Sequence, residues 1–208
     1  MTAPADDDAC TNTAPRRVRM KPGERRQQIL QTLAQMLEQP GADRITTALL
    51  ASRIGVSEAA LYRHFASKAQ MFEGLIDFIE QSLFTLINQI AEREGDGAGK
   101  AVHMTAVVLQ FGARNPGMAR VMVGDALVYE NDRLQQRMMQ FFDRVESALR
   151  QVLRDAAQAR QSATPTADAQ VRAHALVGFA MGHLQRFVRS GFKRSPLDHL
   201  DVALALMV

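Results

Sequence analysis

Helical periodicity is the feature that most restricts how this chain can fold. Apolar residues recur three or four positions apart in segment after segment, and no segment alternates with the two-residue period of a half-buried strand. The composition agrees, because Ala, Leu, Met, Gln and Arg are frequent, aromatic residues make up only 6% and Trp is absent. The sequence therefore predicts an all-α fold.

Turn and capping residues divide this helical pattern into segments. Ser67 and Gln70 have the spacing of a capping box, which opens a long helix. The glycine-rich run 95–99 and the stretch 162–168 are predicted loops. The expected helices cover about residues 23–39, 46–54, 57–65, 67–94, 100–113, 118–129, 131–160, 169–191 and 196–207.

Charge is distributed unevenly along the chain. Residues 1–15 carry three aspartates, residues 16–70 carry ten Lys or Arg against four acids, and residues 71–208 carry equal numbers of both signs. A local basic excess is the electrostatic footprint of a module that binds a polyanion, and a solvated helix face is the alternative. We expect three units, namely a disordered basic tail (1–22), a helix-turn-helix domain (23–70) and a helical dimerisation and partner-binding domain (71–208).

The basic segment contains two short helices joined at Gly55 behind a longer supporting helix. This is the arrangement of a helix-turn-helix, and a purely structural helical hairpin is the alternative. The outward face of the second short helix combines small residues with an aromatic ring and the cation Arg63, which could read a guanine edge or hold a phosphate. The predicted DNA contacts are Thr46, Thr47, Ser57, Glu58, Ala59, Ala60, Tyr62, Arg63, His64 and Lys68.

The sequence lacks the residue patterns of common catalytic and metal sites. The five histidines are scattered, and no two have the i, i+4 spacing of a zinc site on one helix. The chain has no nucleophile elbow and no phosphate-binding Gly-Lys-Ser/Thr loop. Its single cysteine, Cys10, excludes an internal disulfide framework. We therefore expect neither enzymatic activity nor a metal or cofactor.

The apolar runs are too short for a membrane protein. None approaches the roughly 20 residues that a membrane-spanning helix needs. The first ten residues contain three aspartates and no apolar core, unlike a secretory signal peptide. These features predict a cytoplasmic location without a membrane partner.

The basic module resembles the amino-terminal signature of TetR-type DNA-binding proteins. The resemblance is carried by residues 45–51 (Ile-Thr-Thr-Ala-Leu-Leu-Ala), by 55–57 (Gly-Val-Ser) and by 61–68, where Leu-Tyr-Arg-His-Phe is followed by Ser-Lys. It covers about residues 23–75 and implies a TetR-like fold, with an amino-terminal helix-turn-helix joined to a larger helical domain. Ala59-Ala60 departs from the glycine and hydroxyl residue that many TetR proteins carry, which bears on DNA sequence preference.

The resemblance continues into the usually variable carboxy-terminal domain, where it points to the TetR-type proteins of nucleoid occlusion. It implies a nucleoid-associated homodimer that binds a palindromic chromosomal site. DNA-bound copies would then bind the carboxy-terminal tail of the division protein FtsZ and block ring assembly over DNA. The matching segments are 57–65, 71–72, 75–76, 78–80, 114–117, 132–135, 151–154 and 186–190.

The same resemblance implies where the FtsZ tail binds, in a groove between the long helix that opens at Ser67 and the helix over 100–113. A short apolar peptide suits an apolar trough, and a cation at its end can hold a carboxylate or backbone oxygen. Leu86 and Gln110 stand where a basic residue and a glycine are expected, and ordinary core packing is the alternative for the two phenylalanines. The matching positions are Phe78, Val107, Phe111, Arg114 and Asn115.

The helix over 169–191 is apolar around much of its circumference. Gly178 and Gly182 lie four residues apart on it and would let another helix approach closely. One layer of the same chain can hardly cover all the apolar residues, so the last two long helices are predicted to form a dimer seam. A tight helix crossing within the chain is the alternative.

An ordinary ligand-responsive TetR repressor is the competing function. Such a repressor needs a cavity with a few convergent polar groups. The predicted core is almost wholly aliphatic, Met and Phe, which favours a protein partner over a ligand.

Overall fold

The computed structural model describes residues 23–39, 45–93 and 95–208. The predicted basic tail and Cys10 lie outside these residues. The described residues form helices and no strand, so the all-α prediction is confirmed. The helices are α1 (Glu24–Leu37), α2 (Thr47–Ile54), α3 (Glu58–Tyr62), α4 (Lys68–Glu92), α5 (Gly97–Arg114), α6 (Pro116–Met122), the 3₁₀ helix η1 (Asp125–Leu127), α7 (Asp132–Ala159), α8 (Pro165–Arg189) and α9 (Leu200–Ala205).

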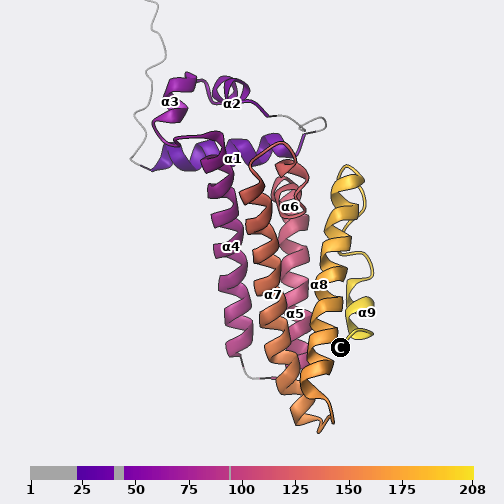
Figure 1. Cartoon of the computed structure of the whole chain (residues 1–208). Helices are drawn as coiled ribbons and strands as arrows, with labels where there is room; N and C mark the ends of the chain where they lie inside the picture. Colours follow the sequence, from indigo (N-terminus) through magenta and orange to yellow (C-terminus); the bar gives the residue numbers. More distant parts are fainter. Residues whose placement is uncertain (1–22, 40–44, 94) are drawn as a thin grey trace, which may run out of the picture.

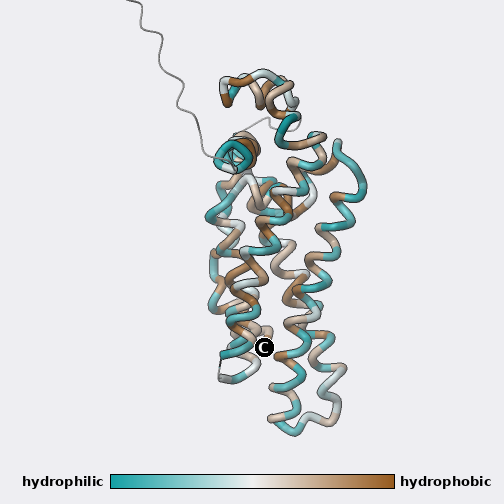
Figure 2. Tube along the Cα trace, turned by 90° about the vertical axis from the view of Figure 1, so that its left-hand side faces the viewer, coloured by the Kyte–Doolittle hydropathy of each residue, from teal (hydrophilic) through white to brown (hydrophobic). Residues whose placement is uncertain are grey.

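The molecule has a small helical module at one end of a bundle of long helices. In Figure 1, α1 lies across the ends of the long helices, and α2 and α3 lie on its far side. Helix α4 runs from this module along the bundle, where it packs against α5 and α7. In Figure 2 the long helices carry hydrophilic and hydrophobic residues along their whole length, as expected of helices with one buried face.

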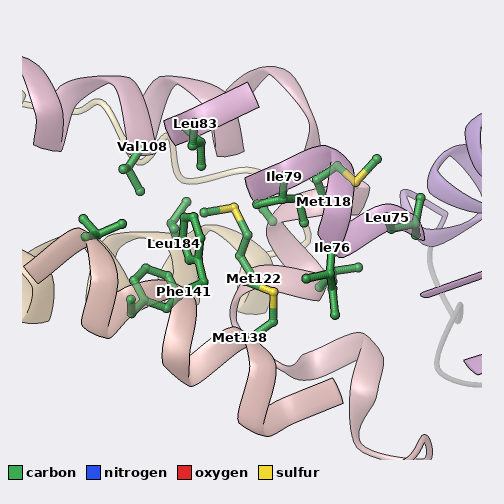
Figure 3. Close-up of a cluster of buried hydrophobic side chains, with 14 of the residues drawn as sticks. Leu75, Ile76, Ile79, Leu83, Val108, Met118, Met122, Met138, Phe141 and Leu184 are labelled. Atoms are coloured by element: carbon green, nitrogen blue, oxygen red, sulfur yellow. The ribbon is translucent and has the colours of Figure 1, made fainter. Parts of the chain in front are cut away.

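One hydrophobic core joins the elements of the bundle. Figure 3 shows side chains from α4, α5, α6, α7 and α8 meeting in it, and nearly all are aliphatic, Met or Phe. Ile79, Phe141 and Leu184 are completely buried there. The stripes predicted from sequence for the helices over 67–94 and 131–160 therefore do line the core. Among the described residues, only Thr105 and Arg120 are buried polar or charged side chains.

Several predicted boundaries were wrong. The 95–99 loop is shorter than predicted, because α5 begins at Gly97 with Asp96 as its N-cap. Glycine serves there for close approach, since a Cβ on Gly97 would lie 2.0 Å from the Val152 carbonyl oxygen. The helix predicted over 118–129 ends at Met122, and the chain turns at Gly124 with φ +79°.

The predicted loop over 162–168 and the last predicted helix also differ. Helix α8 already begins at Pro165, a residue whose fixed φ suits the first turn of a helix. Helix α9 begins only at Leu200, because His199 before it has a left-handed backbone with φ 56°.

The small module is fixed to the bundle mainly through α1 and α6. A Cβ on Gly117 would lie 2.1 Å from the Ala34 carbonyl oxygen, so only glycine permits this helix crossing. The buried Arg120 donates to Asp125 Oδ2 at 2.6 Å and to the Leu37 carbonyl at the end of α1 at 3.4 Å. The position of α1 is therefore set by close backbone contact and a charged hydrogen bond together.

Candidate nucleic-acid interface and partner surface

Helices α2 and α3 form the predicted helix-turn-helix. Thr46 caps α2 by accepting from the Leu49 amide at 3.2 Å, and Ser57 caps α3 by accepting from the Ala60 amide at 3.3 Å. Gly55 ends α2 with a left-handed backbone, φ 75°, which any residue with a Cβ adopts less readily. The buried, inward-facing residues of the module are Leu50, Ala51, Leu61 and Phe65.

The predicted DNA contacts lie together on the outer side of this module. Glu58, Ala59, Tyr62, Arg63 and His64 are exposed, and Ala60 is half-buried. Thr47 Oγ1 donates to Glu58 Oε2 at 2.8 Å, and this bond ties the start of α2 to the start of α3. The outer face thus presents a small residue, an aromatic ring and a cation next to one another, as the sequence predicted.

Lys68 has a partner within the chain. As the first residue of α4 it forms an ion pair with Glu130, which precedes α7, and its ammonium lies 5.7 Å from the Phe72 ring centroid. Its side chain is 27% exposed, and only 11% of the Glu130 side chain is exposed. The ammonium therefore links the helix-turn-helix module to the bundle, a role that the sequence did not reveal.

Arg26 is a residue of this module that sequence reasoning missed. Its guanidinium carbon lies 4.0 Å from the Phe65 ring centroid, and its Nη1 donates to the His64 carbonyl at 3.1 Å. Through these contacts α1 holds in place the residues that directly follow α3. The contact spans 38 positions in sequence, and adjacent arginines at a helix start give no signal of it.

The capping box that opens α4 is confirmed. Ser67 Oγ accepts from the Gln70 amide at 3.2 Å, and Gln70 Oε1 accepts in return from the amide of Ala66 at 2.8 Å. The returning bond reaches one residue further back than in the usual capping box. This bond fixes where α4 begins, directly after the residues that follow α3.

The five predicted partner residues lie on α4, α5 and the turn after α5, which we call the α4–α5 surface. Phe78 is 48% exposed, and its ring centroid lies 6.2 Å from that of the half-buried Phe111. Val107 is also half-buried, so the alternative of ordinary core packing fails for Phe78 but describes Phe111 in part. Asn115 donates to the Phe111 carbonyl at 2.8 Å, which gives its amide a capping role.

The charged end of this surface is Arg114, the last residue of α5. It is exposed, and it forms no hydrogen bond or ion pair with another side chain in the described part of the chain. A cation at a helix C-terminus is favoured by the helix dipole. Two residues of these helices depart from the pattern that the resemblance implies. Leu86 is 42% exposed on α4, and Gln110 is half-buried on α5.

The opposite side of α4 is closed by an ionic network with α7. Arg137 donates to both oxygens of Glu80, at 3.1 and 2.9 Å, and to Asp77 Oδ1 at 2.6 Å. Hydrogen bonds to Glu80 and then to Asp77 raise the pKa of Arg137 above its ordinary value against the opposite effect of burial. Arg144 lies 3.9 Å from the Phe84 ring centroid and extends the network.

An apolar surface is exposed where α7 and α8 lie side by side. Met139 is 67%, Val171 69% and Met181 41% exposed. A Cβ added to Gly178 or Gly182 would meet no atom within 4 Å. The alternative of a tight crossing within the chain is therefore wrong, because neither glycine contacts another described element.

The described residues contain neither a cluster of metal-ligating side chains nor a membrane-spanning helix. No group of three His, Cys, Asp or Glu side chains there could hold a metal ion. None of the helices in this part of the chain combines the length and the apolarity that crossing a membrane requires.

Comparison with known proteins places both parts of the chain. Residues 29–75 match the family of bacterial regulatory proteins of the TetR type, and residues 98–208 match the SlmA-like carboxy-terminal domain of Tetracyclin repressor-like proteins. The fatty acid degradation regulator FadR from Bacillus halodurans has the same fold, with a TM-score of 0.71 at 16% identity over 90% of this chain and 96% of that one. A FadR from Bacillus subtilis, solved with stearoyl-CoA, gives a TM-score of 0.69 at 16% identity. The fold and the helix-turn-helix thus define a TetR-type DNA-binding regulator.

Curated relatives narrow the class further. The nucleoid occlusion factor SlmA of Photobacterium profundum is 51% identical over 87% of this chain and 92% of its own length. SlmA of Vibrio cholerae is 50% identical over 88% of this chain and 93% of its own length. The chain belongs to the SlmA family of nucleoid occlusion factors.

Proposed function

We propose that this protein binds palindromic chromosomal sites as a homodimer and, while bound, inhibits FtsZ ring assembly by binding the carboxy-terminal tail of FtsZ. The observation that carries the proposal is that the helix-turn-helix face and the α4–α5 surface lie apart in the molecule and are connected by helix α4. Helix α4 begins beside the helix-turn-helix and exposes Phe78 three turns further along, on the α4–α5 surface. One molecule can therefore contact DNA and a peptide at the same time.

The DNA part of the proposal rests on the outer face of α3. A five-residue helix with small residues at its start, followed by Tyr62 and Arg63, can enter a major groove without steric conflict. The basic excess of residues 16–70 supplies the electrostatic, salt-dependent part of the affinity. Nucleoid association within the cytoplasm follows from this activity.

The homodimer rests on the apolar surface of α7 and α8. Val171, Gly178 and Gly182 lie on one exposed stripe of α8, and small residues on such a stripe let two helices approach closely. A second copy of the chain would cover it by two-fold symmetry, which suits a palindromic DNA site. We expect light scattering at micromolar concentration to give twice the mass of the chain, and a monomer would contradict this.

The FtsZ part rests on the α4–α5 surface. An exposed phenylalanine beside a half-buried one offers an apolar contact for a short peptide. Arg114 at the edge of this surface is free to pair with a carboxylate of the incoming tail. The chain also contains no acidic residue among the five predicted partner positions, so an acidic peptide meets no repulsion from them.

Mapping all chromosomal sites that the protein occupies tests this function against the repressor alternative. An occlusion factor is expected at many sites that are rare near the replication terminus, and its overproduction should block FtsZ rings. Occupancy of one or two promoters, released by a small molecule, would contradict the proposal.

A further inference from the structure

A cleft of about 670 Å³ opens on the helix-turn-helix module between α1, the turn after α2, and α3. Its sides come from Arg25 on α1 and from Arg63, the C-cap residue of α3. Its floor is formed by the half-buried residues Ile54, Val56 and Ala60, and Ser57 lies at its edge. The cleft brings Arg25 next to Arg63, 38 positions further along the chain, so no local sequence pattern indicates it.

The charged side chains that line this cleft are of one sign in the described part of the chain. Two guanidinium groups line it there, and no carboxylate of the described residues does. Arg25 donates to Gln28 Oε1 at 2.6 Å, which leaves most of its donors unused. The Arg63 side chain forms no hydrogen bond or ion pair with another residue in the described ranges. Two like charges that share a concave, partly apolar surface favour an anion between them.

The chemistry of the lining selects the kind of anion. The planar guanidinium group presents pairs of N–H donors that match two oxygens of a phosphate and bind them in pairs of hydrogen bonds. A partly apolar floor suits a phosphodiester, which carries a sugar on either side of its charge. The cleft also borders Ser57 and Ala60, which lie at the start of α3 on the predicted DNA-binding face.

We propose that this cleft binds a backbone phosphodiester of the DNA duplex, with Arg25 and Arg63 on either side of it. The proposal rests on the proposed DNA-binding function and adds Arg25 to the contact residues. It also assigns Arg63 to a phosphate rather than to a guanine edge. A phosphate held at this point fixes how deeply α3 enters the major groove, because backbone contacts set the orientation of a DNA-binding helix.

The test compares Arg25→Ala with Arg93→Ala, which removes the same charge from the exposed C-cap of α4, at the end of the bundle away from the helix-turn-helix. DNA affinity is measured by fluorescence anisotropy at several salt concentrations, on the palindromic site and on unrelated duplex. For Arg25→Ala we expect a five- to tenfold loss at about 0.1 M salt. The slope of log K against log salt should be reduced by about 1.8, because each of the two protomers loses one phosphate contact. The loss should be equal on both duplexes, because phosphates carry no sequence information. Arg93→Ala should leave both quantities unchanged.

Further measurements separate the possible outcomes. Arg25→Lys should keep the wild-type salt slope while losing part of the affinity, since it retains the charge but not the paired donors. An unchanged salt slope in Arg25→Ala would overturn the proposal. Failure of the wild-type protein to bind palindromic DNA would instead overturn the proposed function. Equal thermal unfolding midpoints of all variants would show that the variants are folded.

Discussion

The two sides of α4 differ sharply although they belong to one helix. Asp77 and Phe78 are consecutive residues, and the turn of about 100° between neighbouring residues of an α-helix directs them to different sides of α4. On the side towards α7, Asp77 and Glu80 are both paired with Arg137. On the side towards α5, Phe78 is half exposed and Arg114 has no ionic partner among the described residues.

This difference separates stability from binding. Charges that are paired within the chain gain nothing further from a partner, and they hold α4 in place against α7. An exposed aromatic ring and an unpaired cation leave interaction free energy that only a partner can use. We therefore expect substitutions on the α7 side of α4 to change folding stability and substitutions on its α5 side to change binding of the FtsZ tail.

The largest effect is expected from Arg114→Asp. Charge reversal removes the cation that pairs with the incoming tail and adds repulsion, so we expect FtsZ tail binding to fall by more than about 30-fold, or about 2 kcal/mol. The variant should also fail to block division. Stability should drop by only a few tenths of a kcal/mol, through the helix dipole. A pull-down with FtsZ beside a DNA titration measures both activities.

The outcomes of that experiment are distinct. Operator affinity should remain intact, since Arg114 lies on the α4–α5 surface and not on the helix-turn-helix. Retained FtsZ binding would remove Arg114 from the site. Loss of DNA binding together with FtsZ binding would mean that the variant is misfolded.

The next largest effect is expected from Arg137→Met on the other side of α4. It leaves Glu80, whose side chain is only 18% exposed, without its main partner. After allowance for the solvent around Asp77, we expect the free energy of unfolding to fall by about 1–2 kcal/mol. Urea denaturation measures this change. Affinity of the folded variant for the FtsZ tail should stay within twofold, and a larger loss would show that the two sides of α4 are not separate.

The smallest effect is expected from Leu86→Arg. This change replaces an exposed apolar side chain by a cation at the position where a basic residue is expected. Attraction to an acidic tail at an exposed site is worth less than about 1 kcal/mol, so affinity should rise by about two- to fivefold and the gain should vanish at high salt. Peptide titrations at two salt concentrations decide this, and an unchanged affinity would place Leu86 outside the binding surface.

The sequence predicted the parts of the molecule that depend on local patterns. Capping residues such as Ser57 and Ser67, and the turn at Gly55, act over three or four positions and could be read directly. The all-α fold followed from periodicity in the same way. The predicted DNA-contacting residues could be proposed from sequence because most of them lie on or directly beside the short helix α3.

The remaining features depend on contacts between distant residues. The Lys68–Glu130 pair spans 62 positions, and the Arg137–Glu80 pair spans 57. The loop predicted at Gly97 is wrong, because the close approach of Gly97 to Val152 cannot be seen in a local sequence pattern. Exposure of Phe78 likewise became evident only when the packing of α4 between α5 and α7 was known.

Site-directed photo-crosslinking tests the central claim, that the α5 side of α4 and not its α7 side binds the FtsZ tail. A photoreactive amino acid is placed at Leu86, or at Gln140, which is exposed on α7 between Arg137 and Arg144. Both proteins are irradiated with FtsZ in the presence of the DNA site. We expect crosslinks to the FtsZ tail from position 86 and none from position 140. Crosslinks from position 140 alone would contradict it.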